Sequence, residues 1–197
     1  MRYDAEHKQK TREKVLDAAA EAIRLDGPHK VAVAGIMAKA GLTHGGFYAH
    51  FESKDDLVAQ AIGHMFDAGA LRRIERMKDR PPGEALTAYI DFYLSAGHRD
   101  ARTTGCPMAA LAGDLPRLDE AAQASFAAGV QRLTGRIAEL LATIGLPDAE
   151  DLASSAVAEM VGALSLARAE PDRARSDLML DRSKRVLKQR LNLELLS

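Results

Sequence analysis

Polar side chains and two adjacent glycines occur together in residues 42–57, LTHGGFYAHFESKDDL. Hydroxyl, imidazole and ammonium groups can donate hydrogen bonds to phosphate oxygens and to base edges. A glycine in a helix interior costs about 1 kcal/mol relative to alanine, so the pair Gly45-Gly46 needs a reason if this segment is helical. The side chains of the segment that carry such donors are those of Thr43, His44, Tyr48, His50 and Lys54.

Cys106 is a second candidate for chemistry, and it is the only cysteine of the 197 residues. A single cysteine excludes an internal disulfide and a cysteine-based zinc site. It stands before Pro107 in TTGCPMAAL, at the expected first turn of a helix, where the helix dipole and Arg102 would favour a reactive thiolate. A buried and inert thiol is the alternative. His98 is the nearby general-base candidate in the sequence, with no third orienting residue, so we expect no catalytic residues.

Composition and charge are those of a globular protein, with 47% hydrophobic residues, 28% charged residues and a net charge of −1. No run of 18 apolar residues occurs and the first residues are charged, so we expect no membrane span, no secretory signal and a cytoplasmic location. Residues 1–50 carry eight Lys and Arg against six Asp and Glu, with four of the six histidines. This basic bias is compatible with an anionic partner and equally with a solvated helix face.

Helical periodicity extends over nearly the whole chain, and no strand-like alternation persists. The sequence therefore predicts an all-α protein, with an N-terminal domain over 1–52 and a second domain over 53–197. Ser53 is expected to cap a long helix, and Gly41 to adopt a positive φ between two short ones. The expected helices are Lys10–Leu25, Ala34–Ala40, Thr43–His50, Ser53 to about Met77, 84–98, 105–113, 117–144, 148–169 and 173–192.

The segment Ile36–Phe51 has the pattern of a helix-turn-helix motif, whose second helix enters the major groove of DNA. Apolar residues spaced to meet beneath the crossing of the helices are Ile36, Leu42, Phe47 and Phe51. Thr43 is expected to cap the second helix and to contact a phosphate, and Lys54 begins the next helix. His44, Gly45 and Gly46 form a slim tip, while Tyr48 and His50 direct polar groups to phosphates. The alternative is a glycine loop with core aromatics.

Residues 11–58, TREKVLDAAAEAIRLDG through IMAKAGLTHGGFYAHFESKDDLV, resemble the DNA-binding domain of the TetR/AcrR family of bacterial transcriptional regulators. The resemblance implies a homodimeric, nine-helix regulator and a near-palindromic DNA partner. It also implies phosphate contacts at Thr43, Tyr48, His50 and Lys54. Ala32 and Ala34 depart from the polar residues that many members have there, so an N-terminal arm of Lys8, Lys10 and Arg12 is expected to replace those contacts.

The remaining two thirds of the chain are expected to bind a small-molecule effector and a second copy of the chain. Residues expected to line the effector pocket are Tyr89, Phe92, Tyr93, Cys106, Met108, Leu111, Phe126 and Val130; an ordinary core is the alternative. Gly105-Cys106-Pro107 also resembles a branch of the family that includes sensors of electrophiles and oxidants. Residues expected at the dimer interface are Val157, Met160, Val161, Leu164, Leu180 and Leu187.

These observations predict a DNA-binding regulator, most simply a repressor released by a small molecule or by modification of Cys106. Two alternatives remain: an architectural DNA binder that has no effector, and an enzyme that uses Cys106 as its nucleophile. No cofactor and no metal ion are expected. The resemblance implies that the dimer sets the two recognition helices about one DNA turn apart, roughly 34–36 Å or a multiple.

Overall fold

The structure is a computed structural model that describes residues 2–75 and 77–193, and side chains from residue 6. These residues form ten α-helices, two short 3-10 segments and one π segment, and none of them lies in a strand, so the all-α prediction is confirmed. The α-helices are α1 (Arg2–Asp26), α2 (Val33–Lys39), α3 (Lys54–Phe66), α4 (Arg72–Glu75), α5 (Pro82–Tyr93), α6 (Ala96–Asp100), α7 (Pro107–Leu111), α8 (Glu120–Thr143), α9 (Ala149–Ala169) and α10 (Arg173–Arg190). The other segments are η1 (His44–Ala49), η2 (Asp67–Leu71) and η3 (Leu115–Arg117).

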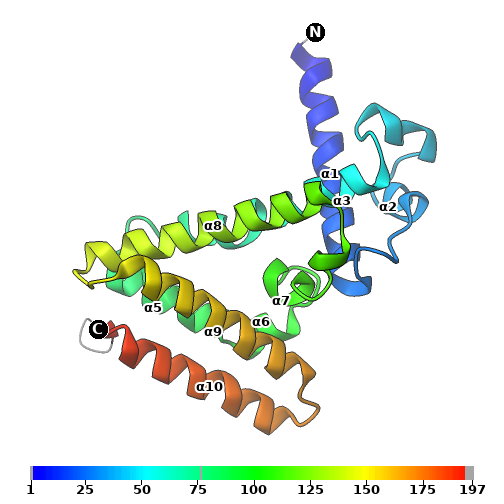
Figure 1. Cartoon of the computed structure of the whole chain (residues 1–197). Coiled ribbons are helices and arrows are strands. Elements are labelled where there is room, and N and C mark those ends of the chain that lie inside the picture. The colour runs from blue at the N-terminus through cyan, green and yellow to red at the C-terminus, as the bar shows by residue number, and fades with distance from the viewer. Residues whose placement is uncertain (1, 76, 194–197) are drawn as a thin grey trace.

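The helices are arranged in two parts that α3 and α8 connect. α1, α2 and η1 lie at one end, and the first turns of α1 project beyond them (Figure 1). α8 runs from this end to the far end of the molecule, where α9 turns back and α10 lies beside it. Because α3 packs against both α1 and α8, a conformational change in the second part can be transmitted through α3 to the first part.

The core of the first part is the one that the sequence predicts. Val15 and Ile23 of α1 are fully buried, and they close over Ile36, Phe47 and Phe51, which are at most 3% exposed. The rings of Phe47 and Phe51 stack with their centroids 5.6 Å apart. Gly41 has a φ of +75°, which is the left-handed conformation that ends α2 and redirects the chain.

The long helix expected from Ser53 to about Met77 begins as predicted but is not regular throughout. The hydroxyl of Ser53 accepts a hydrogen bond from the backbone N–H of Asp56 at 3.0 Å, which is an N-cap. After Phe66 the backbone widens into the π segment η2 before it continues as α4. A π turn takes an extra residue, so Ile74 returns to the buried face and is 4% exposed.

The helix expected over 84–98 is two helices in the structure. α5 ends at Tyr93, and Ser95 begins α6 by accepting a hydrogen bond from the N–H of His98 while donating one to the carbonyl oxygen of Phe92. This serine cap competes with continuation of the helix, and it turns His98 into the interior. α4 and α6 are separate helices and the predicted helix at 43–50 is the 3-10 segment η1, so the described residues form ten α-helices and not the nine predicted helices.

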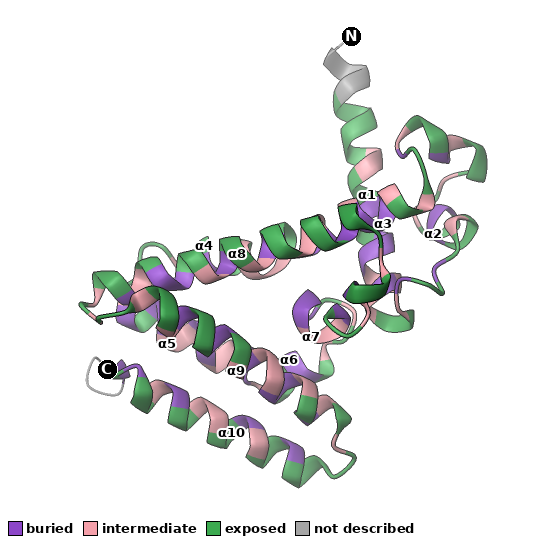
Figure 2. Cartoon of the chain, viewed as in Figure 1, coloured by how far each residue is buried: buried purple, intermediate pink, exposed green. Residues whose placement is uncertain are grey.

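Burial is concentrated on the inner faces of α3, α5, α8 and α9 (Figure 2). By length and composition α9 would be apolar enough to span a membrane, and 39% of its most apolar window is buried within the fold. Its buried residues include Val157, Met160 and Leu164, which belong to the hydrophobic core. α9 therefore contributes to the core and also leaves much of its surface uncovered in the single chain.

Candidate DNA-binding surface and effector cavity

The recognition segment is the 3-10 segment η1, which starts directly after Thr43. Thr43 has an extended backbone, with φ −79° and ψ 150°, as an N-cap residue does, but its side chain makes no capping hydrogen bond. The prediction that Thr43 caps this helix is therefore wrong, because the N–H of Gly46 bonds to the backbone carbonyl of Thr43 instead. The side chain of Thr43 stays exposed beside the tip of the segment.

The two glycines of the tip are not required by the fold. Neither Gly45 nor Gly46 has a positive φ. A Cβ atom at Gly45 would meet no other atom within 4 Å, and one at Gly46 would lie at an ordinary 3.8 Å from Cε of Met37. His44 and Gly45 are exposed, and Tyr48 is 73% exposed with its ring edge on Phe47. The tip is thus a slim outer surface.

His50 and Lys54 are less available than the tip residues. His50 is half-buried, and its Nδ1 is buried with no partner among the described residues. Burial, followed by the charges of Lys8 and Arg12, lowers the pKa of His50. The ammonium of Lys54 donates a hydrogen bond to the carbonyl oxygen of His29 at 3.0 Å. Lys54 therefore fastens the start of α3 to the loop after α1.

The basic N-terminal residues lie on a helix and do not form a separate arm. α1 is already helical at Arg2, so Lys8, Lys10 and Arg12 occupy its first half. Lys8 and Lys10 are exposed, whereas the guanidinium of Arg12 lies 5.5 Å from the ring centroid of Phe51. Ala32 is the N-cap residue of α2, and no side chain caps that helix. Replacement of a phosphate contact there by Lys8, Lys10 and Arg12 stays a prediction, made from a helix and not from an extended arm.

A small cavity lies between α5, η2 and the loop that leads into α7. Its volume is about 40 Å³. Its walls contain four of the eight residues expected in the effector pocket, Tyr89, Phe92, Tyr93 and Cys106. The other lining residues are Gly69, Ala70, Arg73, His98, Thr104, Gly105 and Pro107.

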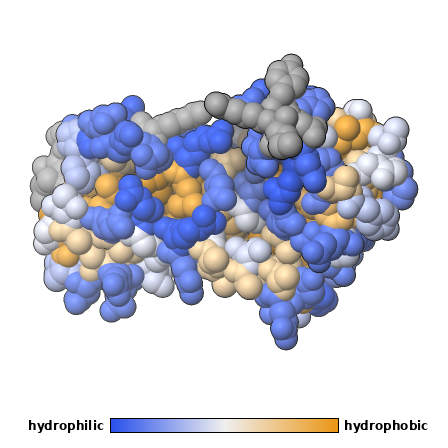
Figure 3. Space-filling model, turned by 90° about the horizontal axis from the view of Figure 1, so that it is seen from above, coloured by the Kyte–Doolittle hydropathy of each residue, from blue (hydrophilic) through white to orange (hydrophobic). Residues whose placement is uncertain are grey.

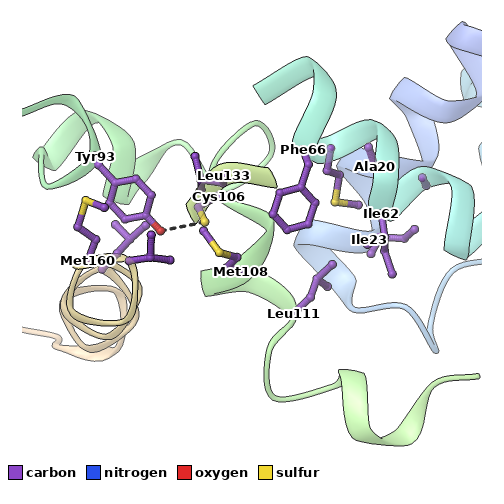
Figure 4. Close-up of a cluster of buried hydrophobic side chains, with 14 of the residues drawn as sticks. Ala20, Ile23, Ile62, Phe66, Tyr93, Cys106, Met108, Leu111, Leu133 and Met160 are labelled. Carbon is purple, nitrogen blue, oxygen red and sulfur yellow. Dashed lines mark hydrogen bonds between the residues drawn. The ribbon is translucent and has the colours of Figure 1, made fainter. Parts of the chain in front are cut away.

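The other four expected pocket residues do not line this cavity. Met108 and Leu111 are buried in the core between Tyr93 and Phe66 (Figure 4). Phe126 packs its ring edge-on against Phe66, with centroids 5.7 Å apart, and Val130 lies half-buried on α8. These residues have the composition of a pocket but form the hydrophobic core, so this half of the predicted lining is wrong for the cavity found.

Cys106 is buried, which opposes the reactive thiolate that its place at a helix N-terminus predicts. The hydroxyl of Tyr93 donates a hydrogen bond to its Sγ at 2.9 Å (Figure 4). Burial raises the pKa of the Cys106 thiol, and this outweighs the hydrogen bonds from Tyr93 and from the first N–H groups of α7. The cation that favours the thiolate is Arg168 and not Arg102.

His98 is held as a neutral imidazole. Its Nδ1 donates to the carbonyl oxygen of Tyr93 at 2.8 Å, and its Nε2 accepts a hydrogen bond from the backbone N–H of Cys106 at 3.0 Å. Burial lowers the pKa of His98 to about 4. Because the basic nitrogen faces a backbone N–H and not the thiol, His98 is not placed as a general base for Cys106.

The sequence did not indicate the surroundings of three polar groups, the hydroxyl of Tyr89 and the guanidinium groups of Arg24 and Arg99. The hydroxyl of Tyr89 is buried and has no hydrogen-bond partner among the described residues. The guanidinium of Arg24 on α1 donates to the carbonyl oxygen of Thr103, in the loop beside the cavity. Arg99 is 5% exposed and bonds to Ser176 and Asp177 of α10. Only the three-dimensional structure shows which arginine and tyrosine side chains are buried away from solvent.

Five of the six residues expected at the dimer interface are part of the chain's own core. Val157, Met160, Leu164, Leu180 and Leu187 are at most 5% exposed, and Val161 is half-buried. The exposed large apolar side chains of α9 and α10 are Leu166, Leu178 and Val186, at 60%, 46% and 45% exposure. In the single chain the most apolar faces of these two helices turn inward, so five of the six predicted residues are occupied by core contacts and the interface itself stays a prediction.

The larger hollows of the molecule are grooves with many charged residues. They measure about 530 Å³ between α1 and α3, about 650 Å³ between α4 and α8, and about 820 Å³ between α8 and the start of α9. An ion pair and a hydrogen bond border two of them: Arg132 lies 2.7 Å from Asp67, and Nε2 of His64 lies 2.7 Å from Oδ1 of Asp17. Seen from above, the surface is mostly hydrophilic, and apolar side chains gather in a recess on one side (Figure 3). The described residues contain no cluster suited to a metal ion.

Comparison with protein families matches both parts of the chain. Residues 15–61 match the model of the bacterial regulatory proteins of the tetR family. Residues 82–178 match the C-terminal domain of LmrA/YxaF-like transcriptional regulators. The chain belongs to the TetR family of transcriptional regulators. The family binds DNA, so this chain is a DNA-binding transcriptional regulator.

Individual relatives of this TetR-family regulator agree with that assignment. An uncharacterised helix-turn-helix transcriptional regulator of Mycobacterium tuberculosis is 29% identical over 181 residues, covering 87% of this chain and 91% of that protein. A TetR regulator of Chloroflexus aurantiacus has a TM-score of 0.78 at 26% identity, covering 95% of this chain and 96% of that one. The reduced form of NemR from E. coli has a TM-score of 0.80 at 18% identity, covering 91% and 97%, and shows the same fold.

Proposed function

We propose that this TetR-family regulator acts as a homodimeric repressor that binds a near-palindromic operator through η1 and is released when its second part binds a small molecule. The observation that carries the DNA contact is the tip of η1. Glycine at positions 45 and 46 is explained neither by a positive φ nor by internal crowding. The remaining explanation for the two glycines is that the tip must closely approach the surface of another molecule. A segment that enters the major groove of DNA makes such an approach.

The side chains around the tip suit this contact. Thr43 and His44 are exposed, and the hydroxyl of Tyr48 extends from a ring that is 73% exposed. These groups can donate hydrogen bonds to phosphates and base edges. His50 and Lys54 are committed to the fold to a larger extent, so their contribution is to hold the segment in place, and Lys54 also adds positive charge near the backbone of DNA.

The dimer proposal rests on the outer faces of α9 and α10. Leu166, Leu178 and Val186 are three of the five large apolar side chains that are exposed in the described chain. Paired across a two-fold axis, these helices would form a four-helix bundle and cover such side chains. A two-fold axis would also place the two η1 segments for two half-sites of one operator.

The cavity beside Tyr89 is the proposed effector site because it joins the two parts of the chain. Gly69 and Thr104 line this cavity and also line a groove of about 260 Å³ that reaches Arg24 of α1. Filling the cavity would displace the loop that contains Thr104, and Arg24 would transmit this movement to the DNA-binding end. Such coupling is allosteric in the two-state sense.

Modification of Cys106 is a second route to release. Its sulfur lines the cavity and is oriented by Tyr93, which favours it as a target, while its raised pKa opposes reaction as a thiolate. Cys106→Ser should keep operator binding and remove any response of that binding to quinones, aldehydes or peroxide. A response that persists in Cys106→Ser excludes the thiol route and leaves non-covalent binding.

The proposed function is tested by selecting bound sequences from a random duplex pool with the full-length protein at one near-physiological salt concentration. Salt must be fixed because contacts to phosphate weaken steeply as it rises. Enrichment of a palindrome, together with a dimeric mass in solution, supports the proposal. A folded dimer that enriches no sequence would instead support an architectural DNA binder.

A further inference from the structure

We propose that the cavity beside Tyr89 and the groove beside Arg24 form one binding site for short, unbranched oxocarboxylic acids. Such a molecule has a carboxylate at one end of a carbon chain, which would meet Arg24, and a methyl ketone at the other end, which would meet Tyr89. The inference rests on the proposed function in which this cavity is the effector site, and it names the chemical class of the effector.

The hydroxyl of Tyr89 is the inner of the two donors that a ligand would satisfy. Tyr89 is 1% exposed and lines the cavity, and its oxygen has no hydrogen-bond partner among the described residues. A buried hydroxyl without a partner costs free energy, and such groups in native proteins need an explanation. Burial raises the pKa of Tyr89, so the hydroxyl keeps its proton and is offered to an acceptor such as a ketone oxygen.

The guanidinium of Arg24 is the outer donor, and it lines the groove of about 260 Å³. Its Nη1 is used by backbone carbonyl oxygens, whereas the edge formed by Nε and Nη2 makes no hydrogen bond among the described residues. The two acids of this groove are bonded to other groups: Asp17 lies 2.7 Å from His64. Glu21 lies 2.7 Å from Lys39. Two parallel N–H groups of a partly buried cation match the two oxygens of a carboxylate.

The groove and the cavity meet at Gly69 and Thr104, which line both of them. A Cβ atom at Gly69 would meet no atom within 4 Å, so the backbone of η2 leaves an open gap here. The charge of a Cys106 thiolate raises the pKa of both Arg24 and Tyr89, which places the two donors within electrostatic range of one side chain. A short carbon chain is therefore enough to connect them.

The size of the cavity favours the end of a chain over a ring. Its volume of about 40 Å³ slightly exceeds the roughly 30 Å³ share of a water molecule in the liquid, whereas benzene binds in an engineered cavity of about 150 Å³. A ketone oxygen with its methyl group is a small end of this kind, and the rings of Phe92 and Tyr93 offer it an apolar wall. The groove, at about 260 Å³, approaches the lower limit of ligand pockets, roughly 300 Å³, and would hold the rest of the chain.

The test titrates the free full-length protein with oxo acids of increasing length, namely 5-oxohexanoate, 6-oxoheptanoate and 7-oxooctanoate, and follows binding by ligand-observed NMR. Each oxo acid is compared with two analogues of the same chain length, the plain acid, which lacks the ketone, and the methyl ketone, which lacks the carboxylate. We expect at least one oxo acid to bind about tenfold more tightly than both of its analogues, because it alone satisfies both donors.

Two substitutions separate the contributions of the two donors. Tyr89→Phe should weaken the preferred oxo acid about tenfold, to the affinity of the plain acid, and leave the plain acid unchanged. Arg24→Met should weaken the same oxo acid about tenfold or more, to the affinity of the methyl ketone, and leave the methyl ketone unchanged. Arg136→Met is the control, because it removes a cation of α8 that pairs with Glu139 and lines neither hollow, and it should leave every affinity unchanged.

Oxo acids that bind no more tightly than their analogues, or a preference that survives Tyr89→Phe or Arg24→Met, overturn the inference. Absence of binding by every probe also overturns it and assigns the cavity to ordered water. Specific operator binding is measured separately, on the same protein without probes. Absence of specific operator binding, with the preference for an oxo acid intact, would count against the proposed regulator and not against the ligand class.

Discussion

The guanidinium of Arg24 donates a hydrogen bond over 3.2 Å to the carbonyl oxygen of Thr103, 79 positions later in the chain. Arg24 lies in the last turn of α1, and Thr103 lies in the loop between α6 and α7 that leads to Cys106. Nη1 of Arg24 also makes a long 3.4 Å contact with the carbonyl oxygen of Ala20, and its Nε is buried with no partner among the described residues. Burial lowers the pKa of Arg24, which shows that this cation has lost much of its water.

A partly buried cation with so few partners adds little to stability and is retained where it has another role. Here it joins the DNA-binding end to the loop that lines the cavity. Tight packing holds that loop, because a Cβ atom at Gly105 would lie 2.6 Å from the carbonyl oxygen of Ala101 and from Arg168. A movement of the loop therefore changes the contact with Arg24.

Arg24→Met is predicted to uncouple the two parts of the chain. Methionine keeps an apolar stem and removes the donors and the buried charge, so the stability of the fold should change little. Linkage is reciprocal, so operator binding must change the loop if the loop controls operator binding. We expect operator DNA to alter amide hydrogen exchange over residues 101–107 in the wild type and not in Arg24→Met.

Lys39→Met is the control for that experiment. Lys39 also bonds to α1, through an exposed ion pair with Glu21 at 2.7 Å, but it does not touch the loop. Lys39→Met should show the same change in amide hydrogen exchange on operator binding as the wild type. An equal exchange response in Arg24→Met and Lys39→Met would show that coupling does not pass through Thr103.

Gly46→Leu and Gly45→Leu are predicted to retain the fold and lose specific DNA binding. Neither position is crowded inside the protein, and leucine favours helix over glycine by about 1 kcal/mol, so the unfolding temperature should hold or rise. A leucine at the tip would keep the segment out of the groove, and operator affinity should fall by about 100-fold or more, on the scale of 1–3 kcal/mol for each lost base contact. Gly135→Leu, on the exposed face of α8, is the control and should retain affinity. Unchanged affinity in Gly46→Leu would remove the groove explanation.

Gly129→Ala is predicted to destabilise the crossing of α3 and α8. Its Cβ would lie 2.3 Å from Cδ2 of Phe66, and overpacking of this kind costs about 1–3 kcal/mol. Gly135→Ala on the same helix meets nothing and should stabilise by up to about 1 kcal/mol. Urea unfolding measures both, and Phe66→Leu added to Gly129→Ala should recover part of the loss. A neutral Gly129→Ala would show that the crossing relaxes freely.

Stability is predicted to fall between pH 6.5 and pH 4 because of His98. The folded chain holds the pKa of His98 near 4, below its ordinary value of 6.5. The unfolded chain therefore binds more protons in this window, and the free energy of unfolding declines as the pH falls, by up to about 3 kcal/mol. His98→Gln, which can donate and accept but does not titrate here, should flatten this part of the profile. Parallel profiles for the two proteins would rule out His98 as the source.

The sequence predicted those features whose signals are local. Gly41, Ser53 and the spacing of Ile36, Phe47 and Phe51 specify the turn, the cap and the core of the first part within a few turns of helix. The resemblance of residues 11–58 to the TetR family added the role of a DNA-binding transcriptional regulator, and the match to that family confirms this role.

The errors have a shared physical cause, which is that burial depends on partners far away in the chain. The sequence shows that Cys106 stands at the N-terminus of a helix. It does not show that Tyr93 and the core surround the sulfur. Val157 and Leu187 are apolar on amphipathic helices, and periodicity cannot say whether a given stripe faces its own chain or a partner.

Irregular backbone conformation also could not be predicted from the sequence. The π segment at Asp67–Leu71 directly follows Phe66, whose ring lies against Gly129, a residue 63 positions later in the sequence. The unpartnered hydroxyl of Tyr89 is likewise a property of the assembled cavity. In the sequence Tyr89 is one of three aromatic residues on the helix at 84–98.

The most direct test of the central claim is the affinity of the full-length protein for its selected palindrome and for a scrambled duplex of equal length, both measured at one near-physiological salt concentration. A sequence-specific regulator should bind the palindrome at least about 1,000-fold more tightly, as two chains per duplex. Equal affinity for the two duplexes would contradict the account, because phosphate contacts alone would then explain the binding.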